Sequence, residues 1–326
     1  MTGTDLPPAH PPFDAELAAA LAAAEDVPTT VTPDMLAALR RGAAESAPSL
    51  TAIAEEFGVT VRTVTVSRTD APDLRLLVAH PAGSRAGSAA LYWIHGGGVV
   101  LGDFRFGVDL ALAWAVEFGV PVVSVDYRLA PAHPDPAAVE DCYAGFRWVA
   151  GHATELGIDP SRLVLAGHSA GAGLAAGTAL LARDRRGPRA AGQLLLCPML
   201  DDRELTPASR QLDGVGVWDR TANRTAWEAR LGARRGGPAV EPYSAPARAT
   251  DLGGLPPAFV DVGSVDTFRD EAVDYATRIW QAGGVAELHV WPGAYHCFEI
   301  LAPAAAVSAA AVGRRTDWLR RALRPA

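Results

Sequence analysis

The sequence predicts an α/β fold in which a mostly parallel sheet of eight strands is covered by helices on both faces. Three observations predict it. The chain has eight short apolar or β-branched runs, helical stretches separate most of these runs, and 326 residues of which 49% are hydrophobic can bury a large core. Strands that alternate with helices favour parallel pairing with helices on both sides.

The first 50 residues differ from the rest of the chain. After a proline-rich start, Asp14 can cap a helix in which Leu17 and Leu21 lie four residues apart on one face. A second helix is expected from Pro33 to Arg41, with the proline at its first position. These short helices lack a core of their own, so we expect them to pack on the remainder of the chain.

The expected strands begin at residue 58. The first run is β-branched and changes phase along its length, which indicates a bulge. The runs from residue 89 on are near-continuous and apolar, as is typical of strands that are buried on both faces. The expected strands are 58–68, 74–79, 89–94, 120–125, 163–166, 194–197, 258–262 and 286–290. The expected helices are 137–150, 170–183, 269–282 and a closing helix that ends in Trp318 and Leu319.

One segment, residues 201–245, breaks the alternation. It carries no strand pattern, is rich in arginine, glycine and tryptophan, and is too long for an ordinary connection. We therefore expect an insertion with structure of its own.

Composition excludes several classes of protein. The 29 basic and 37 acidic residues give a net charge of −8, and no basic stretch suggests a nucleic-acid partner. All the basic residues are arginine, which excludes mechanisms that need a lysine on a phosphate, in a Schiff base or beside a serine nucleophile. No secretory signal and no membrane-spanning stretch is visible, so a cytoplasmic location without a membrane partner is expected.

The three cysteines carry no recognisable pattern. Cys142, Cys197 and Cys297 lack metal-ligand spacing, and their number is odd. The sequence therefore predicts neither a metal site nor a disulfide framework, and Cys142 and Cys197 are interpreted as buried reduced thiols.

The first chemical signal is Gly-His-Ser-Ala-Gly at residues 167–171. It follows the expected strand 163–166 and precedes a helix, which is the context that a Gly-x-Ser-x-Gly nucleophile turn requires. A serine on such a sharp turn presents its hydroxyl at the edge of the sheet. Ser169 is thus a candidate nucleophile.

The second signal is His-Gly-Gly-Gly at residues 95–98, directly after the strand 89–94. Consecutive glycines let backbone N–H groups gather around one point without a Cβ in the way. An oxyanion hole needs such fixed donors. A phosphate-binding loop is the rival interpretation, but neither a P-loop lysine nor Gly-x-Gly-x-x-Gly spacing is present.

A serine nucleophile needs a base, and downstream of Ser169 the chain offers two histidines. His289 lies inside the last strand. His296 follows that strand in a loop, and α/β sheets place functional groups in loops at the carboxyl ends of strands. His296 is the candidate base.

The base needs an orienting acid between the serine and the histidine in the sequence. Asp261 lies inside the strand 258–262, and Asp270 and Glu271 begin the next helix, where capping is the ordinary explanation. Asp266 lies just beyond the strand end and is the candidate acid.

These motifs together resemble the hormone-sensitive-lipase family of α/β-hydrolase carboxylesterases, bacterial type. The resemblance runs from about residue 60 to the end of the chain. It rests on five motifs in the expected order, which are residues 95–98, Asp126-Tyr-Arg-Leu-Ala-Pro-Ala-His-Pro, residues 167–171, Asp266-Thr-Phe-Arg-Asp-Glu and Tyr295-His-Cys-Phe.

The resemblance implies the α/β-hydrolase fold and a serine carboxylesterase without metal or cofactor. Ser169 would be the nucleophile, His296 the base and Asp266 its partner. The implied oxyanion donors are the backbone N–H groups of Gly97, Gly98 and Ala170.

The resemblance also implies a helical cap. Residues 1–50 and the insertion 201–245 would form it, over a catalytic domain of residues 51–200 and 246–326. Trp218 and Trp227 in the insertion are candidates to line the acyl or alcohol pocket, with cap core as the alternative interpretation.

The expected substrate is a small-molecule ester with a short to medium acyl chain. An amidase or deacetylase with the same triad is an alternative. A non-catalytic binding protein on this fold is disfavoured because His296 is present. The resemblance leaves open a homodimer that pairs through the last strand.

Four other residues near the motifs receive an interpretation. Arg128 is expected to tie loops near the site, and His95 to anchor the glycine loop. Three positions depart from the family pattern, and one of these departures, Gly171-Ala172-Gly173 in place of Gly-Gly-Asn, should be tolerated. His168 precedes the nucleophile, and Cys297 takes a place beside the base that is commonly glycine, which predicts sensitivity to thiol reagents.

Overall fold

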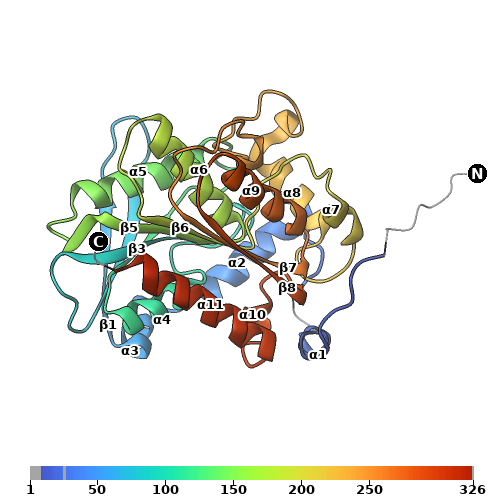
Figure 1. The fold of residues 1–326 in the computed structure, drawn as a ribbon, viewed down its shortest axis with the longest axis horizontal. Coiled ribbons are helices and arrows are strands. Elements are labelled where there is room, and N and C mark those ends of the chain that lie inside the picture. The colour runs from blue at the N-terminus through green and yellow to red at the C-terminus, as the bar shows by residue number, and fades with distance from the viewer. Residues whose placement is uncertain (1–8, 25–26, 325–326) are drawn as a thin grey trace, which may run out of the picture.

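The computed structural model describes residues 9–24 and 27–324. In this part of the chain a single eight-stranded sheet has the order β1-β2-β4-β3-β5-β6-β7-β8 (Figure 1). β1 pairs with β2 and β2 with β4 in antiparallel orientation, and the remaining pairs are parallel. The fold class is therefore as predicted. The strands are β1 (Val59–Val66), β2 (Leu74–Pro81), β3 (Ser88–Ile94), β4 (Val122–Asp126), β5 (Ile158–His168), β6 (Gly192–Leu196), β7 (Ala258–Val265) and β8 (Ala286–Tyr295).

Helices cover both faces of the sheet (Figure 1). One face carries α5 (Ala137–Gly151), α6 (Ala170–Asp184) and α9 (Arg269–Gln281), and the other carries α3 (Leu50–Phe57), α4 (Val108–Phe118) and α11 (Ala306–Ala322). Successive side chains of a strand point to opposite faces. In β3, Tyr92 packs into the core under the first set of helices, and Trp93 packs into the core under the second. Burial on both faces explains the continuous apolar runs.

The bulge expected in the first strand is absent, and that prediction was wrong. β1 pairs with β2 in one register from Val59 to Val66. The phase change has another cause. Val59 and Val61 pack into the core on the α3 side of the sheet, and Val64 and Val66 pack into the core on the opposite side. Each face of this edge strand is covered over only half its length.

Both expected N-terminal helices occur, and the first packs against the end of β8. α1 (Ala15–Ala23) is capped by Asp14, whose carboxylate accepts from the backbone N–H groups of Glu16 and Leu17 at 2.9 and 3.2 Å. Leu17 is buried with Tyr295 at the end of β8. The second expected helix begins as a single 3₁₀ turn, Pro33–Met35, and continues as α2 (Leu36–Ser46), five residues beyond the expected end at Arg41.

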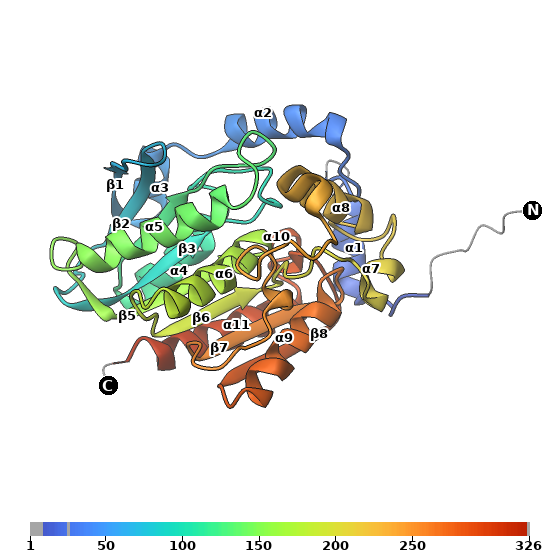
Figure 2. The same ribbon diagram turned by 90° about the horizontal axis from the view of Figure 1, so that it is seen from above.

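The insertion forms two α-helices, α7 (Pro207–Gln211) and α8 (Arg220–Leu231), and a 3₁₀ turn at Gly232–Arg234, with no strand between residues 201 and 245. The N-terminal segment binds to it. Asp219, the N-cap of α8, donates its N–H to the carbonyl of Thr29 at 3.1 Å and accepts from the Thr30 hydroxyl at 2.5 Å. Figure 2 shows α1, α2, α7 and α8 along one border of the sheet. Among the described residues, no helix is both long enough and apolar enough to cross a membrane.

A buried ion-pair cluster joins α11 to β7, β8 and the helix that follows β8. Arg315 donates to Asp261 in β7 at 2.7 Å and to Glu299 in α10 (Phe298–Leu301) at 2.5 Å. The Trp291 indole also donates to Asp261, at 3.0 Å. All three charged side chains are buried. Asp261, one of the alternative acids, is therefore engaged away from the histidine.

We predict that Arg315→Leu lowers the free energy of unfolding by about 3–5 kcal/mol, because it leaves two buried carboxylates without their cation. The neighbouring Arg314→Leu is the control. That side chain is 62% exposed and lies 3.5 Å from Asp317, so its loss should cost less than about 1 kcal/mol. Chemical denaturation measures both variants, and equal losses would contradict the role of the buried cluster.

Candidate active site

Ser169 lies on a strained turn between β5 and α6. Its φ of 58° and ψ of −122° are unusual for a residue with a side chain. Its N–H donates to the carbonyl of Leu196, at the end of β6, at 2.8 Å. Small neighbours are necessary here. A Cβ on Gly167 would lie 2.4 Å from the Gly171 carbonyl oxygen, and a Cβ on Gly171 would lie 2.0 Å from the Ile94 carbonyl oxygen.

The structure brings the three predicted triad residues together. His296 Nε2 lies 2.9 Å from Ser169 Oγ, and His296 Nδ1 lies 2.9 Å from Asp266 Oδ2. Asp266 Oδ1 accepts the N–H of Phe268 at 2.9 Å, which fixes the carboxylate. The three residues follow β5, β7 and β8, whose carboxyl ends share one edge of the sheet.

All three side chains are buried, with 1–4% of each residue exposed. Burial lowers the pKa of His296, but Cys197 and Asp266 raise it, and the net pKa lies well above the ordinary value. The arrangement favours an imidazolium, which is the form that arises when His296 accepts the serine proton.

The glycine loop lies against this turn. Gly97 and Gly98 have φ of 91° and 65°, so both adopt the left-handed region that favours glycine. A Cβ on Gly96 would lie 3.0 Å from the His168 carbonyl oxygen and 3.4 Å from Ser169 Cβ. Among the described residues, the N–H groups of Gly97, Gly98 and Ala170 have no hydrogen-bond acceptor. Donors are thus available next to the serine.

His95 contacts the loop as expected. Its Nδ1 lies 2.9 Å from the Gly96 carbonyl, and its ring stacks on Tyr127 at a centroid distance of 4.1 Å. The Tyr127 hydroxyl donates to the carbonyls of His95 and Gly96 at 2.8 and 3.1 Å. Burial lowers the pKa of His95 to about 4, so the ring is neutral at neutral pH.

The two tryptophans of the insertion have different surroundings. A Cβ on Gly98 would lie 2.5 Å from the Trp218 ring, so this ring covers the glycine loop. Trp227 has no exposed surface, and Arg230 stacks over its ring at 5.2 Å. The contacts of Trp227 favour the alternative interpretation, a core position in the cap, over a place in the pocket.

Two acidic residues of α9 hold the insertion. Glu271 is buried and accepts from the backbone N–H groups of Leu200 and Asp201 at 2.6 and 3.2 Å. Asp270 accepts from the N–H of Ala208 at 2.7 Å. The expectation that they cap their own helix was wrong, because their carboxylates satisfy the backbone of another segment.

Arg128 ties the segment after β4 to α5. Its guanidinium donates to both carboxylate oxygens of Asp141, each at 2.8 Å. Asp141 also accepts from Arg68 at 2.6 Å. The contacts of Arg128 are those of a structural anchor, as expected.

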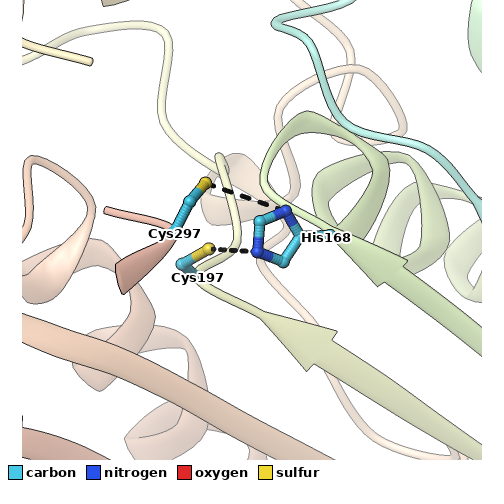
Figure 3. A group of neighbouring side chains, drawn as sticks. All are labelled: His168, Cys197 and Cys297. Carbon is cyan, nitrogen blue, oxygen red and sulfur yellow. Dashed lines mark hydrogen bonds between the residues drawn. The ribbon is translucent and has the colours of Figure 1, made fainter. Parts of the chain in front are cut away.

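Sequence reasoning missed the surroundings of His168 (Figure 3). Its Nε2 lies 3.5 Å from Cys197 Sγ and 3.4 Å from Glu299 Oε1, and its Nδ1 lies 3.8 Å from Cys297 Sγ. Burial lowers the pKa of His168, but Cys197 and Glu299 raise it to about 10. Burial also raises the pKa of the Cys197 thiol, so Glu299 is the anion that faces His168 at neutral pH. The one sequence feature that could have indicated this proximity is the position of Cys197 directly after a buried strand.

Comparisons with known proteins show which family this chain is similar to. A model of the alpha/beta hydrolase fold family matches residues 91–300. Carboxylesterase NlhH of Mycobacterium tuberculosis is 37% identical over 253 residues, which are 77% of this chain and 79% of that protein. Among solved structures, a bacterial heroin esterase has a TM-score of 0.87 at 37% identity and covers 96% of this chain and 98% of its own. Esterase LipW of Mycobacterium marinum has a TM-score of 0.87 at 32% identity, with 97% and 99% covered.

The buried, neutral His95 predicts a loss of stability in acid. In the unfolded chain an ordinary histidine binds a proton near pH 6.5, whereas His95 in the folded chain does so only near pH 4. Between these values the unfolded state binds more protons, so stability falls as pH falls, by about 3 kcal/mol. His95→Asn removes this contribution. Urea denaturation from pH 7 to pH 4 should show a steeper loss in the wild type than in the variant, and parallel losses would contradict the assignment.

Proposed function

Because the chain belongs to the α/β-hydrolase family, as a carboxylic ester hydrolase of the hormone-sensitive-lipase type, we propose that Ser169, His296 and Asp266 hydrolyse short- to medium-chain acyl esters. The observation that carries the proposal is the continuous hydrogen-bonded chain from Ser169 Oγ through both nitrogens of His296 to Asp266, with 2.9 Å at each link.

The reaction has two halves. His296 Nε2 accepts the proton of Ser169 Oγ as this oxygen attacks the carbonyl carbon of the ester. The imidazolium then gives the proton to the departing alcohol, which leaves an acyl group on Ser169. In the second half, His296 takes a proton from water as the water attacks the acyl carbon. The imidazolium then returns the proton to Ser169 Oγ as the bond between this oxygen and the acyl carbon breaks, and the carboxylic acid leaves. Asp266 accepts the Nδ1–H throughout, so Nε2 remains free to exchange the proton.

Three backbone N–H groups are proposed as the oxyanion hole. Gly97, Gly98 and Ala170 offer N–H donors that have no acceptor within residues 9–24 and 27–324, on the loop and the helix start that flank Ser169. The first turn of α6 adds the positive end of the helix dipole. These groups would stabilise the negative oxygen of the tetrahedral intermediate, and loss of one such donor typically costs about 10²–10³ in rate.

The segments 1–50 and 201–245 are proposed as a cap over a catalytic domain of residues 51–200 and 246–326. The hydrogen bonds of Asp219 to the N-terminal segment support a cap built from both parts. Trp218 is the proposed limit of the acyl pocket, because its ring lies directly over Gly98. A bulky, fixed ring at this place favours short acyl chains.

The first test is hydrolysis of p-nitrophenyl esters from acetate to laurate. We expect the wild type to be most active on chains below about ten carbons and Ser169→Ala to lose this activity, because the variant lacks the hydroxyl that lies 2.9 Å from His296 Nε2. Trp218→Ala should shift the optimum to longer chains. Ser124→Ala is the control, since Ser124 is a buried serine in β4.

Activity on none of these esters, with Ser169 unreactive to a phosphonate probe, would contradict the proposal and favour a binding protein. Activity on the matching p-nitroanilides that exceeds activity on the esters would favour the amidase alternative.

Asp266→Asn tests the acid. The amide can hold His296 in the wrong tautomer, so we expect kcat to fall by about 10⁴. Loss of the negative charge also removes a cause that raises the pKa of His296, so the residual pH–rate profile should have its midpoint at lower pH. Asp270→Asn is the matched control, four residues away on α9. An effect of Asp270→Asn as large as that of Asp266→Asn would contradict the assignment.

A further inference from the structure

Three side chains that lie far apart in the sequence meet behind the catalytic histidine. His168 ends β5, Cys197 follows β6 and Cys297 precedes α10. Figure 3 shows both thiols pointing toward the imidazole ring of His168. One ligand atom from each of the three residues, two sulfurs and a nitrogen, lies within 4.8 Å of the other two. Spacing along the chain predicted no metal site, because these residues come from three separate loops.

The spacing of these atoms fits a metal ion of borderline softness. Zinc binds thiolate sulfur at about 2.3 Å and imidazole nitrogen at about 2.0–2.1 Å, so tetrahedral geometry separates neighbouring ligand atoms by about 3.5–3.8 Å. Cys297 Sγ already lies 3.8 Å from His168 Nδ1, whereas Cys197 Sγ lies 3.5 Å from Nε2 and has to shift toward the Nδ1 side to share the cation. Two thiolates and one imidazole select zinc, cadmium or cobalt(II) over magnesium or calcium, which prefer oxygen ligands.

The surroundings also orient the histidine as a ligand. With Nδ1 on the metal, the Nε2–H faces Glu299 Oε1 at 3.4 Å. Arg315 holds that same oxygen at 2.5 Å, so the carboxylate is fixed in place. A histidine that binds metal through one nitrogen commonly donates the other N–H to a carboxylate, which sets the tautomer and the ring orientation.

We propose that His168, Cys197 and Cys297 form a binding site for a zinc-like divalent cation and that binding there suppresses ester hydrolysis. Binding converts two thiols to thiolates and the His168 imidazolium to neutral imidazole, so it releases three protons to solvent, and it involves no oxidation or reduction. Cys297 is partly exposed, whereas Cys197 and His168 are buried, so the cation enters on the Cys297 side.

The proposed coupling between metal binding and catalysis follows from the contacts and the connectivity of the two cysteines. Cys297 is bonded to His296, and Cys197 Sγ also lies within 4.8 Å of a ring nitrogen of His296 and a carboxylate oxygen of Asp266. Because Cys297 Sγ is already at tetrahedral spacing from His168 Nδ1, the atom that a cation draws in is Cys197 Sγ, and this changes the contacts of that sulfur with His296 and Asp266. A displacement of about 1 Å at a reacting group can cost about 10²-fold in rate. Metal binding itself does not depend on the proposed function, whereas the inhibition does.

Cobalt(II) titration tests the site directly. Thiolate ligation of cobalt gives a strong near-ultraviolet charge-transfer absorption, which is independent of activity. We expect the metal-free wild type to gain this absorption up to one equivalent of cobalt and to lose it when zinc is added. In parallel, zinc should reduce p-nitrophenyl acetate hydrolysis by at least about tenfold, and EDTA should restore the rate.

Cys297→Gly is the principal variant. Cys297 has φ 60°, so glycine suits its backbone and the variant should fold. Cys197→Ala is the second variant, and Cys142→Ala is the control, because Cys142 is buried in α5 and belongs to neither cluster. Each variant is compared by its ratio of rates with and without zinc, so a change in its basal rate does not affect the comparison.

We expect the absorption and the zinc effect to be lost in Cys297→Gly and Cys197→Ala and kept in Cys142→Ala. Absence of the absorption in the wild type overturns the site. Equal inhibition in all variants overturns the coupling and locates the cation on the triad itself. Cobalt binding without inhibition in an active enzyme supports the site and overturns the coupling, while an inactive wild type that still binds cobalt overturns the proposed function alone.

Discussion

The close approach of two backbone segments is the constraint on which the rest of the site depends. The start of α6 touches the end of β3, where a Cβ on Gly171 would lie 2.0 Å from the Ile94 carbonyl oxygen and 2.4 Å from that of His95. Gly96 in turn lies against the carbonyl of His168. Only glycine permits this contact. It places unengaged N–H groups beside a serine whose strained turn points its hydroxyl at His296.

Buried charges hold the elements around this contact. Glu271 and Asp270 bind the backbone of the insertion to α9, and Asp219 binds the N-terminal segment to α8. Arg315 joins β7, α10 and α11, and its partner Glu299 lies 3.4 Å from His168, the residue before Ser169. The ion-pair cluster of Arg315 therefore extends to the residue before Ser169, and a buried charge in it without its partner would be costly.

Local pattern predicted most of the fold, because strands buried on both faces and helices with caps leave signals in adjacent residues. All eight strands occur within a few residues of the predicted ranges, except that β5 and β8 extend five residues further. The failures are instructive. The phase change in β1 arises because different elements pack on its two faces. The carboxylate of Glu271 accepts hydrogen bonds from a segment some 70 residues away in the sequence. Neither partner is visible in a local window.

The sequence by itself determined which chemical groups the candidate site contains. Three features are short-range: glycines that must pack against backbone, a serine between a strand and a helix, and polar residues just beyond strand ends. The order of these features along the chain restricted the candidate acid and base to Asp266 and His296. Only the tertiary structure decided which side chains touch. Parallel strands bring loops from residues 168, 197 and 297 to one edge, so two cysteines without any spacing motif meet one histidine. Such proximity arises from strand order, which no local pattern records.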